Sequence, residues 1–233
     1  MLGNIPVDVV HKKIKNVHLS VYPPNGKVRI SAPERMNIET IRVFAISKLS
    51  WIKKQQANLR KQDRETVREY LERESHFYLG RRYLLRLVDH KPISAVFIRH
   101  EHIEIHQRGE STPSKARNIL QNWYREEIRR IGGEFIKKWE PKLGVEVVEY
   151  GIKAMKTKWG TGNPVAKRIW LNLELAKKPA ECIEYIVVHE MIHIIVRKHD
   201  DEFVSLMNKH LPKWKFYRKE LNRSPLRHEN WTY

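Results

Sequence analysis

Hydrophobic and polar residues alternate in the first part of the chain, and this period of two indicates strands. The alternation runs from Val17 to Tyr22 and resumes from Val28 to Ser31, after a Pro-Pro-Asn-Gly turn. The pattern predicts antiparallel strands within residues 6–32, with a hairpin at that turn. Four further apolar runs bounded by turn residues predict a second small antiparallel sheet, with strands at His76–Leu79, Tyr83–Val88, Ala95–Arg99 and Ile103–His106.

Apolar residues at helical spacing predict longer elements around these strands. One amphipathic helix is expected over residues 37–61, with an asparagine as its N-cap, and the densely charged residues 64–74 predict a helical connector. The same spacing predicts a second long helix over residues 113–139. It opens with a proline, which is favoured in the first turn of a helix. Pro141 and Gly144 are expected to end it.

The second half of the chain predicts strands followed by helices. Strands are expected at Val145–Tyr150 and Arg168–Leu173, and the glycines of KTKWGTG predict a loop at residues 156–162. Helices are expected at residues 200–211 and, after a proline, over the last apolar positions that begin at Trp214. The strand at Arg168–Leu173 has two interpretations: an edge strand that holds an extended peptide by backbone hydrogen bonds, or an ordinary core strand.

These elements predict an α+β fold. Residues 1–110 would form an antiparallel, β-rich N-terminal portion with a long helix, and residues 111–233 would form a second portion. The two portions can also form one continuous domain.

Within the stretch from Glu181 to Phe203, apolar residues from Ile183 onward predict a helix that is apolar on most of its circumference and is therefore buried. Within it, His189, Glu190 and His193 form the motif HExxH. Histidines four residues apart on a helix point from one face and can share a metal ion, with the glutamate beside them as candidate base. Satisfied core histidines are the alternative, but burying these polar side chains without partners is costly.

His199 follows His193 by six residues and offers the third protein ligand that an open zinc site uses. The same spacing occurs in the metzincins, which have a glycine where this chain has Val196. On an uninterrupted helix His199 would be rotated by about 240° from His193. We therefore expect the helix to end near Arg197, so that His199 can return to the metal.

The composition adds a strong positive charge. Lys and Arg number 45 against 27 Asp and Glu, which gives a net charge of +18. This charge favours nucleic acid or nucleotides as partners, and a solvated basic surface is the alternative. Cys182 is the single cysteine, and the sequence contains neither a signal-peptide pattern nor a long uninterrupted apolar run. We expect a cytoplasmic protein that does not associate with membranes.

Three segments, KTKWGTG, IWLN and IVVHEMIHIIVRKHDDEF, together resemble the YgjP-like metallopeptidase-domain family. The early hairpin and the following helix with Trp51 are also similar to that family, so the resemblance covers nearly the whole chain. It implies a zincin-like catalytic portion and a zinc-dependent hydrolase acting on peptides or proteins. In this reading His189, His193 and His199 bind Zn²⁺ and Glu190 is the catalytic base.

Several alternatives stay open at this point. The same metal and base would also serve the hydrolysis of nucleotides or other anionic phosphoanhydrides, and a nucleic-acid-binding module with a structural zinc is a third interpretation. His210 and Tyr217 are candidates for stabilising an oxyanion, with a surface histidine and a core tyrosine as the alternatives. His100, His102 and His106 suggest a second metal site or surface histidines.

Overall fold

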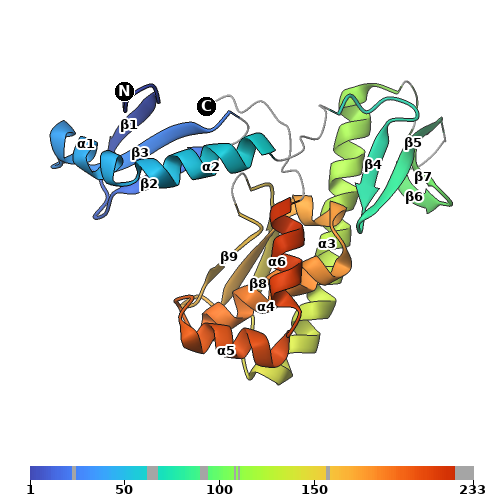
Figure 1. Ribbon diagram of the computed structural model, residues 1–233. Helices are drawn as coiled ribbons and strands as arrows, with labels where there is room; N and C mark the ends of the chain where they lie inside the picture. The colour runs from blue at the N-terminus through green and yellow to red at the C-terminus, as the bar shows by residue number, and fades with distance from the viewer. Residues whose placement is uncertain are drawn as a thin grey trace. The chain divides into compact units, whose positions relative to one another are not determined.

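The computed structural model describes residues 1–22, 25–61, 68–89, 94–107, 109, 111–155 and 158–223 (Figure 1). The fold is α+β, as predicted. The described residues up to 61 form one compact unit, and those from 68 to 223 form another. The strands at residues 75–107, grouped with the N-terminal portion in the sequence analysis, are therefore part of the second unit.

The first unit contains a three-stranded sheet built from β1 (Val7–Lys12), β2 (His18–Tyr22) and β3 (Lys27–Pro33), in the order β1-β3-β2. The predicted hairpin is present, because β2 and β3 pair antiparallel. The prediction of a wholly antiparallel sheet was wrong, since β1 pairs parallel to β3. Alternation identifies strands, but the insertion of β3 between β1 and β2 is decided by packing.

Two helices cover this sheet where one was predicted. They are α1 (Ile38–Ser47), whose N-terminus is capped by the Asn37 side chain, and α2 (Leu49–Lys61). The break falls at Lys48, whose backbone N–H donates to the carbonyl three residues back, at Ala45, and so tightens the last turn. The apolar periodicity continues across the break, and the core of the unit consists of Leu2, Val28, Ile30, Ala32, Ile41, Ala45 and Ile52.

The second unit begins with a four-stranded sheet in which all four predicted strands are present. They are β4 (Ser75–Tyr78), β5 (Arg81–Asp89), β6 (Ala95–Arg99) and β7 (His102–Gln107), in the order β4-β5-β7-β6. Two antiparallel hairpins are joined by parallel pairing of β5 with β7. The sheet is therefore mixed and not antiparallel as predicted.

The predicted helical connector was also wrong where it can be compared, because residues 68–74 are not helical; residues 62–67 lie outside the described residues. Backbone groups of this segment bond to β5: Arg73 donates to the Leu85 carbonyl, and Leu85 donates to that of Glu74. The Glu74 carboxylate in turn accepts the N–H groups of Glu69 and Tyr70. These bonds replace the helical ones that a charged sequence would otherwise make.

Helix α3 (Pro113–Leu143) runs from the β4–β7 sheet to the other end of the second unit (Figure 1). It begins at the predicted proline, but it continues past Pro141 and ends where Gly144 adopts a left-handed conformation, with φ of 66°. Pro141 therefore does not end the helix; it stands in the last turn. The α3 side chains of Lys138 and Trp139 donate to the Glu184 carboxylate, which ties α3 to the next long helix.

The other sheet of the second unit is also mixed. It contains β8 (Glu149–Lys153), β9 (Gly160–Asn163) and β10 (Arg168–Asn172), in the order β8-β10-β9. Of the two interpretations of the strand that begins at Arg168, the core strand is correct, because β10 lies between β8 and β9. The predicted loop was wrong over Gly160–Gly162, which belong to β9. The remaining helices are α4 (Ala180–Ile195), α5 (Asp201–His210) and α6 (Trp214–Arg223), and a short 3₁₀-helix at Leu173–Lys177 precedes α4.

Helix α4 contacts α3, β9, β10, α5 and α6 and is the centre of the second unit. Its buried residues include most of the predicted apolar positions, among them Ile183, Ile186 and Val187. None of the helices in the described ranges combines the length and the apolar character that a bilayer crossing requires.

Candidate metal centre

Helix α4 positions His189 and His193 one turn apart on the same face. Their ring centroids are 4.8 Å apart, and both side chains are partly buried. Glu190 follows His189 directly and is almost fully buried, with 7% of its surface exposed. The helix thus places the two imidazoles on one face and the carboxylate on the neighbouring, buried face.

The end of α4 brings His199 back to the other two histidines. The helix ends at Ile195, and Val196 adopts an extended conformation, in agreement with the predicted end near Arg197. The His193 Nδ1 atom lies 3.0 Å from the Val196 carbonyl oxygen, which can only accept a hydrogen bond, so Nδ1–H donates to it and Nε2 is directed to the other two rings. The terminus of the helix therefore both turns the chain and orients a ring.

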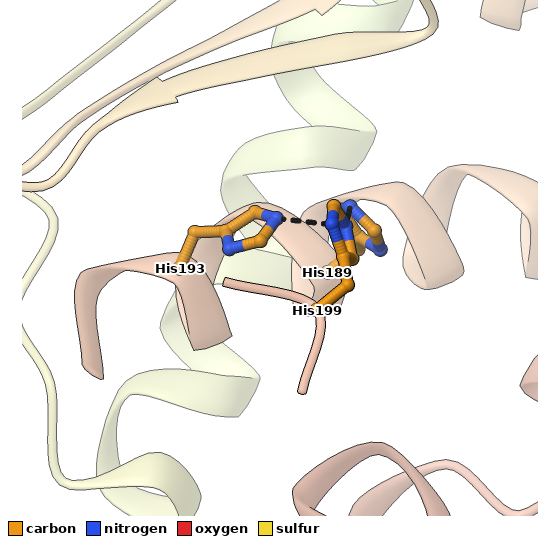
Figure 2. Close-up of side chains that lie close together, drawn as sticks. All are labelled: His189, His193 and His199. Atoms are coloured by element: carbon orange, nitrogen blue, oxygen red, sulfur yellow. Dashed lines mark hydrogen bonds between the residues drawn. The ribbon is translucent and has the colours of Figure 1, made fainter. Parts of the chain in front are cut away.

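The three Nε2 atoms converge on one point. That of His199 lies 3.1 Å from the Nε2 atoms of His189 and His193, and the three rings turn toward one another (Figure 2). A tetrahedral metal with metal–nitrogen bonds of about 2.0–2.1 Å requires its nitrogen ligands to be about 3.3–3.4 Å apart. Within the described ranges, no other cluster of three His, Cys, Asp or Glu residues has ligand atoms this close.

The protonation of the histidines suits a cation. Burial, followed by the charges of His193 and His199, lowers the pKa of His189 to about 3. Burial, followed by the charge of His193, also lowers the pKa of His199. Neutral imidazoles are the form that binds metal, so the lowered pKa values of His189 and His199 suit a metal ion.

Phe203 lies against all three rings. It is 1% exposed, and its ring centroid is 5.0 Å from that of His189, 4.9 Å from that of His193 and 4.7 Å from that of His199. Asp200 caps α5 by accepting the Phe203 backbone N–H at 3.2 Å. The first turn of α5 therefore carries an apolar support for the cluster.

Strand β9 approaches Glu190 closely at its two glycines. A Cβ atom at Gly160 would lie 2.8 Å from the Oε1 atom of Glu190, and one at Gly162 would lie 3.2 Å from Oε2. Burial raises the pKa of Glu190 to about 7, although the charge of Lys158 and the backbone N–H of Gly162 act in the opposite direction. The two glycines predict a loop from the sequence. In the structure they allow strand β9 to lie close to the Glu190 carboxylate.

Asn172, at the end of β10, holds the segment that leads into β9. Its amide nitrogen donates to the carbonyls of Met155 and Lys158, and its amide oxygen accepts the N–H groups of Met155 and Glu174. It is 1% exposed, and its backbone N–H donates to the Trp159 carbonyl. Asn172 thus holds Lys158 through its side chain and Trp159 through its backbone.

A cavity of about 430 Å³ opens over these residues. It is lined by the three histidines and Glu190, by β9 and by Lys158 and Trp159 of the KTKWGTG segment. Its lining also includes Tyr185, Arg197 and Arg218, to which the sequence assigned no role. His210 and Tyr217, the predicted oxyanion candidates, are not among the lining residues; His210 packs against Trp139 and Tyr217 against Phe216.

The second metal site considered for the histidines at 100–106 does not form. The Nε2 atom of His106 bonds to Glu104 at 3.1 Å, and His100 occupies a turn with φ of 51°. Over the ranges that the structure describes, the triad is the one convergent group of this kind.

Comparison with protein-family models matches residues 15–224 to the description "YgjP-like, metallopeptidase domain". The chain belongs to this family. The match includes the histidine triad, Glu190, β9 and Asn172, and it makes the chain a metallopeptidase-type hydrolase. A search among curated proteins found no match.

Two solved structures are similar to part of this YgjP-like chain. The metallopeptidase zymogen abylysin of Pyrococcus abyssi is 18% identical, with a TM-score of 0.36, over 41% of this chain and 99% of its own. The metallopeptidase zymogen jannalysin of Methanocaldococcus jannaschii is 22% identical, with a TM-score of 0.34, over 40% of this chain and 92% of its own. The similar part is less than half of this chain.

Some residues of the site carried a signal that could have revealed them. Tyr185 stands four residues before His189, so helical spacing places it on the histidine face. Gly160 and Gly162 are two apart, the spacing of one face of a strand. Arg197 and Arg218 had no such signal, because only the folding of the chain around α4 brings them to the cavity.

Proposed function

We propose that this chain hydrolyses peptide bonds with a Zn²⁺ ion held by His189, His193 and His199 and with Glu190 as general base. The convergence of three Nε2 atoms beside a buried carboxylate carries the proposal. When bound, zinc supplies Lewis acidity that lowers the pKa of a water molecule and polarises a carbonyl group. Family membership supports the peptidase reaction.

In this proposal Glu190 accepts a proton from the attacking water and passes it to the leaving amine. Its carboxylate lines the cavity together with the three histidines. The contact with β9 restricts its rotation, and burial excludes bulk water from it. The protein thereby holds the base in one place while the histidines hold the metal.

The position of β9 supports a peptide substrate. β9 pairs with β10 on one side, and no strand of the described residues pairs with its other side. Such an edge can bind an extended peptide through backbone hydrogen bonds, with the scissile bond near Glu190. A nucleotide would gain nothing from a free strand edge.

Zinc content and hydrolysis test the proposal directly. Wild-type protein should carry about one zinc per chain, and His193→Ala should lose it, while His210→Ala, outside the cavity, should keep it. Protein that stays free of zinc in zinc-replete buffer without chelators would contradict the metal site.

Replacing the base separates catalysis from structure. Glu190→Gln keeps the shape of the side chain, so we expect it to retain zinc and stability but to hydrolyse peptides at least about 10²-fold more slowly. Glu181→Gln, at an exposed position of the same helix, should hydrolyse at the wild-type rate. Hydrolysis of nucleotides and not of peptides or casein would favour the phosphoanhydride alternative.

A further inference from the structure

The cavity over the triad is lined by three cations and one carboxylate. The cations are Lys158, Arg197 and Arg218, and the carboxylate is Glu190, the proposed base. All three cationic side chains are exposed to solvent. We refer to Lys158, Arg197 and Arg218 together as the cationic rim.

The cationic rim is assembled from three separate parts of the fold. Lys158 precedes β9, and its backbone carbonyl accepts from Asn172 at 2.7 Å. Arg197 follows the extended Val196 between α4 and α5, and Arg218 lies on α6, which packs against α4. Three separate segments of the second unit therefore each bring one cation to the cavity.

The cationic rim shares its cavity with the proposed catalytic groups. Arg218 lies on α6, which packs against α4, the helix that carries His189 and His193, and all three residues line the cavity. Lys158 and Glu190 line the same cavity.

The cationic rim has no acidic partner among the residues that the structure describes. No carboxylate in these ranges lies within ion-pair distance of Lys158, Arg197 or Arg218, whereas Arg130 on α3 pairs with Glu127 and Glu134. Unpaired cations around a partly apolar cavity offer charge-assisted hydrogen bonds to a substrate carboxylate.

We propose that the site selects peptides with an aspartate or glutamate side chain next to the scissile bond, with Arg218 as its main contact. This inference rests on the proposed peptidase function and names its substrate class. The free edge of β9 binds the peptide backbone, and the cationic rim binds the acidic side chain. Tyr185, Ile186 and Leu221 line the apolar part of the cavity, which suits the methylene groups of such a side chain.

The preference for an acidic side chain is measured with pairs of peptides. The two peptides of a pair differ at one position, which is Glu in one and Gln in the other, and each position that flanks the scissile bond is tested in turn. At low salt we expect the zinc-loaded wild type to prefer the Glu peptide by about five- to tenfold in kcat/KM, with a smaller ratio at high salt, because the contacts are exposed. Arg218→Gln should bring the ratio close to one. Lys219→Gln, an equal loss of charge at an exposed position of the same helix, should leave it unchanged.

Charge reversal provides a positive test. Arg218→Glu should prefer a peptide with Lys at the position where the wild type prefers Glu. An equal ratio in wild type and Arg218→Gln, or a wild-type ratio of one at every position, would overturn the proposal.

Binding without turnover separates this proposal from the proposed function. Zinc-loaded Glu190→Gln is titrated with the labelled Glu and Gln peptides, and fluorescence anisotropy should show tighter binding of the Glu peptide, dependent on Arg218. If the wild type cleaves no peptide but this preference is present, the peptidase reaction fails and the selectivity stands. If peptides are cleaved without any preference, the selectivity fails and the reaction stands.

Discussion

Phe203 contacts the rings of His189, His193 and His199 from one side, and it is fully buried. Metal ligands depend on neighbouring groups to hold their rings in place, and replacing such groups typically weakens metal binding by about 10–100-fold. The Phe203 ring stacks on that of His193 and meets those of His189 and His199 edge-on, and these van der Waals contacts limit the rotation of the imidazoles. Its removal should therefore loosen the triad without removing a ligand.

We predict that Phe203→Leu binds zinc about tenfold more weakly than the wild type, as measured by competition with a chelator. Phe216→Leu is the matched control, because Phe216 lies on α6 and is 61% exposed. Equal zinc affinity in wild type and Phe203→Leu would show that the histidines hold their positions without this support.

His76 is a buried histidine outside the metal centre. It is 4% exposed, and its Nε2 atom lies 3.2 Å from the Glu74 carboxylate. Burial lowers its pKa from 6.5 to about 4, and the charge and hydrogen bond of Glu74 oppose this only in part. The unfolded chain therefore binds more protons than the folded one between pH 6.5 and pH 4.

The stabilising effect of neutral His76 is complete above pH 6.5 and is lost as the pH falls toward 4. Between about pH 7 and pH 5, we expect the wild type to lose about 1–2 kcal/mol more of its free energy of unfolding than His76→Gln does. Urea unfolding of zinc-free protein at both pH values measures this difference. The same pH dependence in both proteins would contradict the assignment.

At the scale of elements, β9 has two roles: it is the free edge of a sheet and it lies against the base. The second role depends on its glycines, because a Cβ atom at Gly160 would come within 2.8 Å of the Glu190 carboxylate and within 2.7 Å of Ile186. At Gly162 the nearest approach to Glu190 is 3.2 Å, which needs a smaller adjustment. Side chains at these two positions should disturb the base to different degrees.

We predict that Gly160→Ala retains zinc but hydrolyses peptide about 10–100-fold more slowly, because the displaced carboxylate no longer meets the water. Gly162→Ala should show a smaller loss in the same assay. Full activity of Gly160→Ala, or a larger loss at Gly162 than at Gly160, would mean that β9 does not position Glu190.

At the scale of the whole molecule, the metal centre and its cavity are built entirely from the second unit. The net charge of +18 belongs to the chain as a whole. A positive surface binds polyanions mainly by releasing their counterions, which makes binding strongly dependent on salt.

We predict that the protein binds double-stranded DNA without sequence preference at low salt, and that the affinity falls by at least about 10³-fold between roughly 50 and 200 mM salt. Anisotropy titrations with labelled duplexes of two unrelated sequences measure this. If no binding is measured even at the lowest salt, the positive charge does not serve DNA binding and only forms a solvated surface.

The sequence by itself determined the features that depend on local spacing. HExxH and the following His199 placed three imidazoles within reach of one metal, because four residues make about one helical turn and the helix has to end before a residue six further on can return. Alternation and turn residues located most strands, and Asn37 and Pro113 marked where two of the helices begin.

Only the tertiary structure decided which strands are neighbours, because the same alternation suits parallel and antiparallel partners; all three sheets proved to be mixed. It also made β9 an edge strand against Glu190, and it brought Lys158 and Arg218, 60 positions apart in the numbering, to one cavity. These are long-range contacts made by packing around α4. Hydrophobic periodicity cannot predict such contacts, because it depends only on residues that are close together in the sequence.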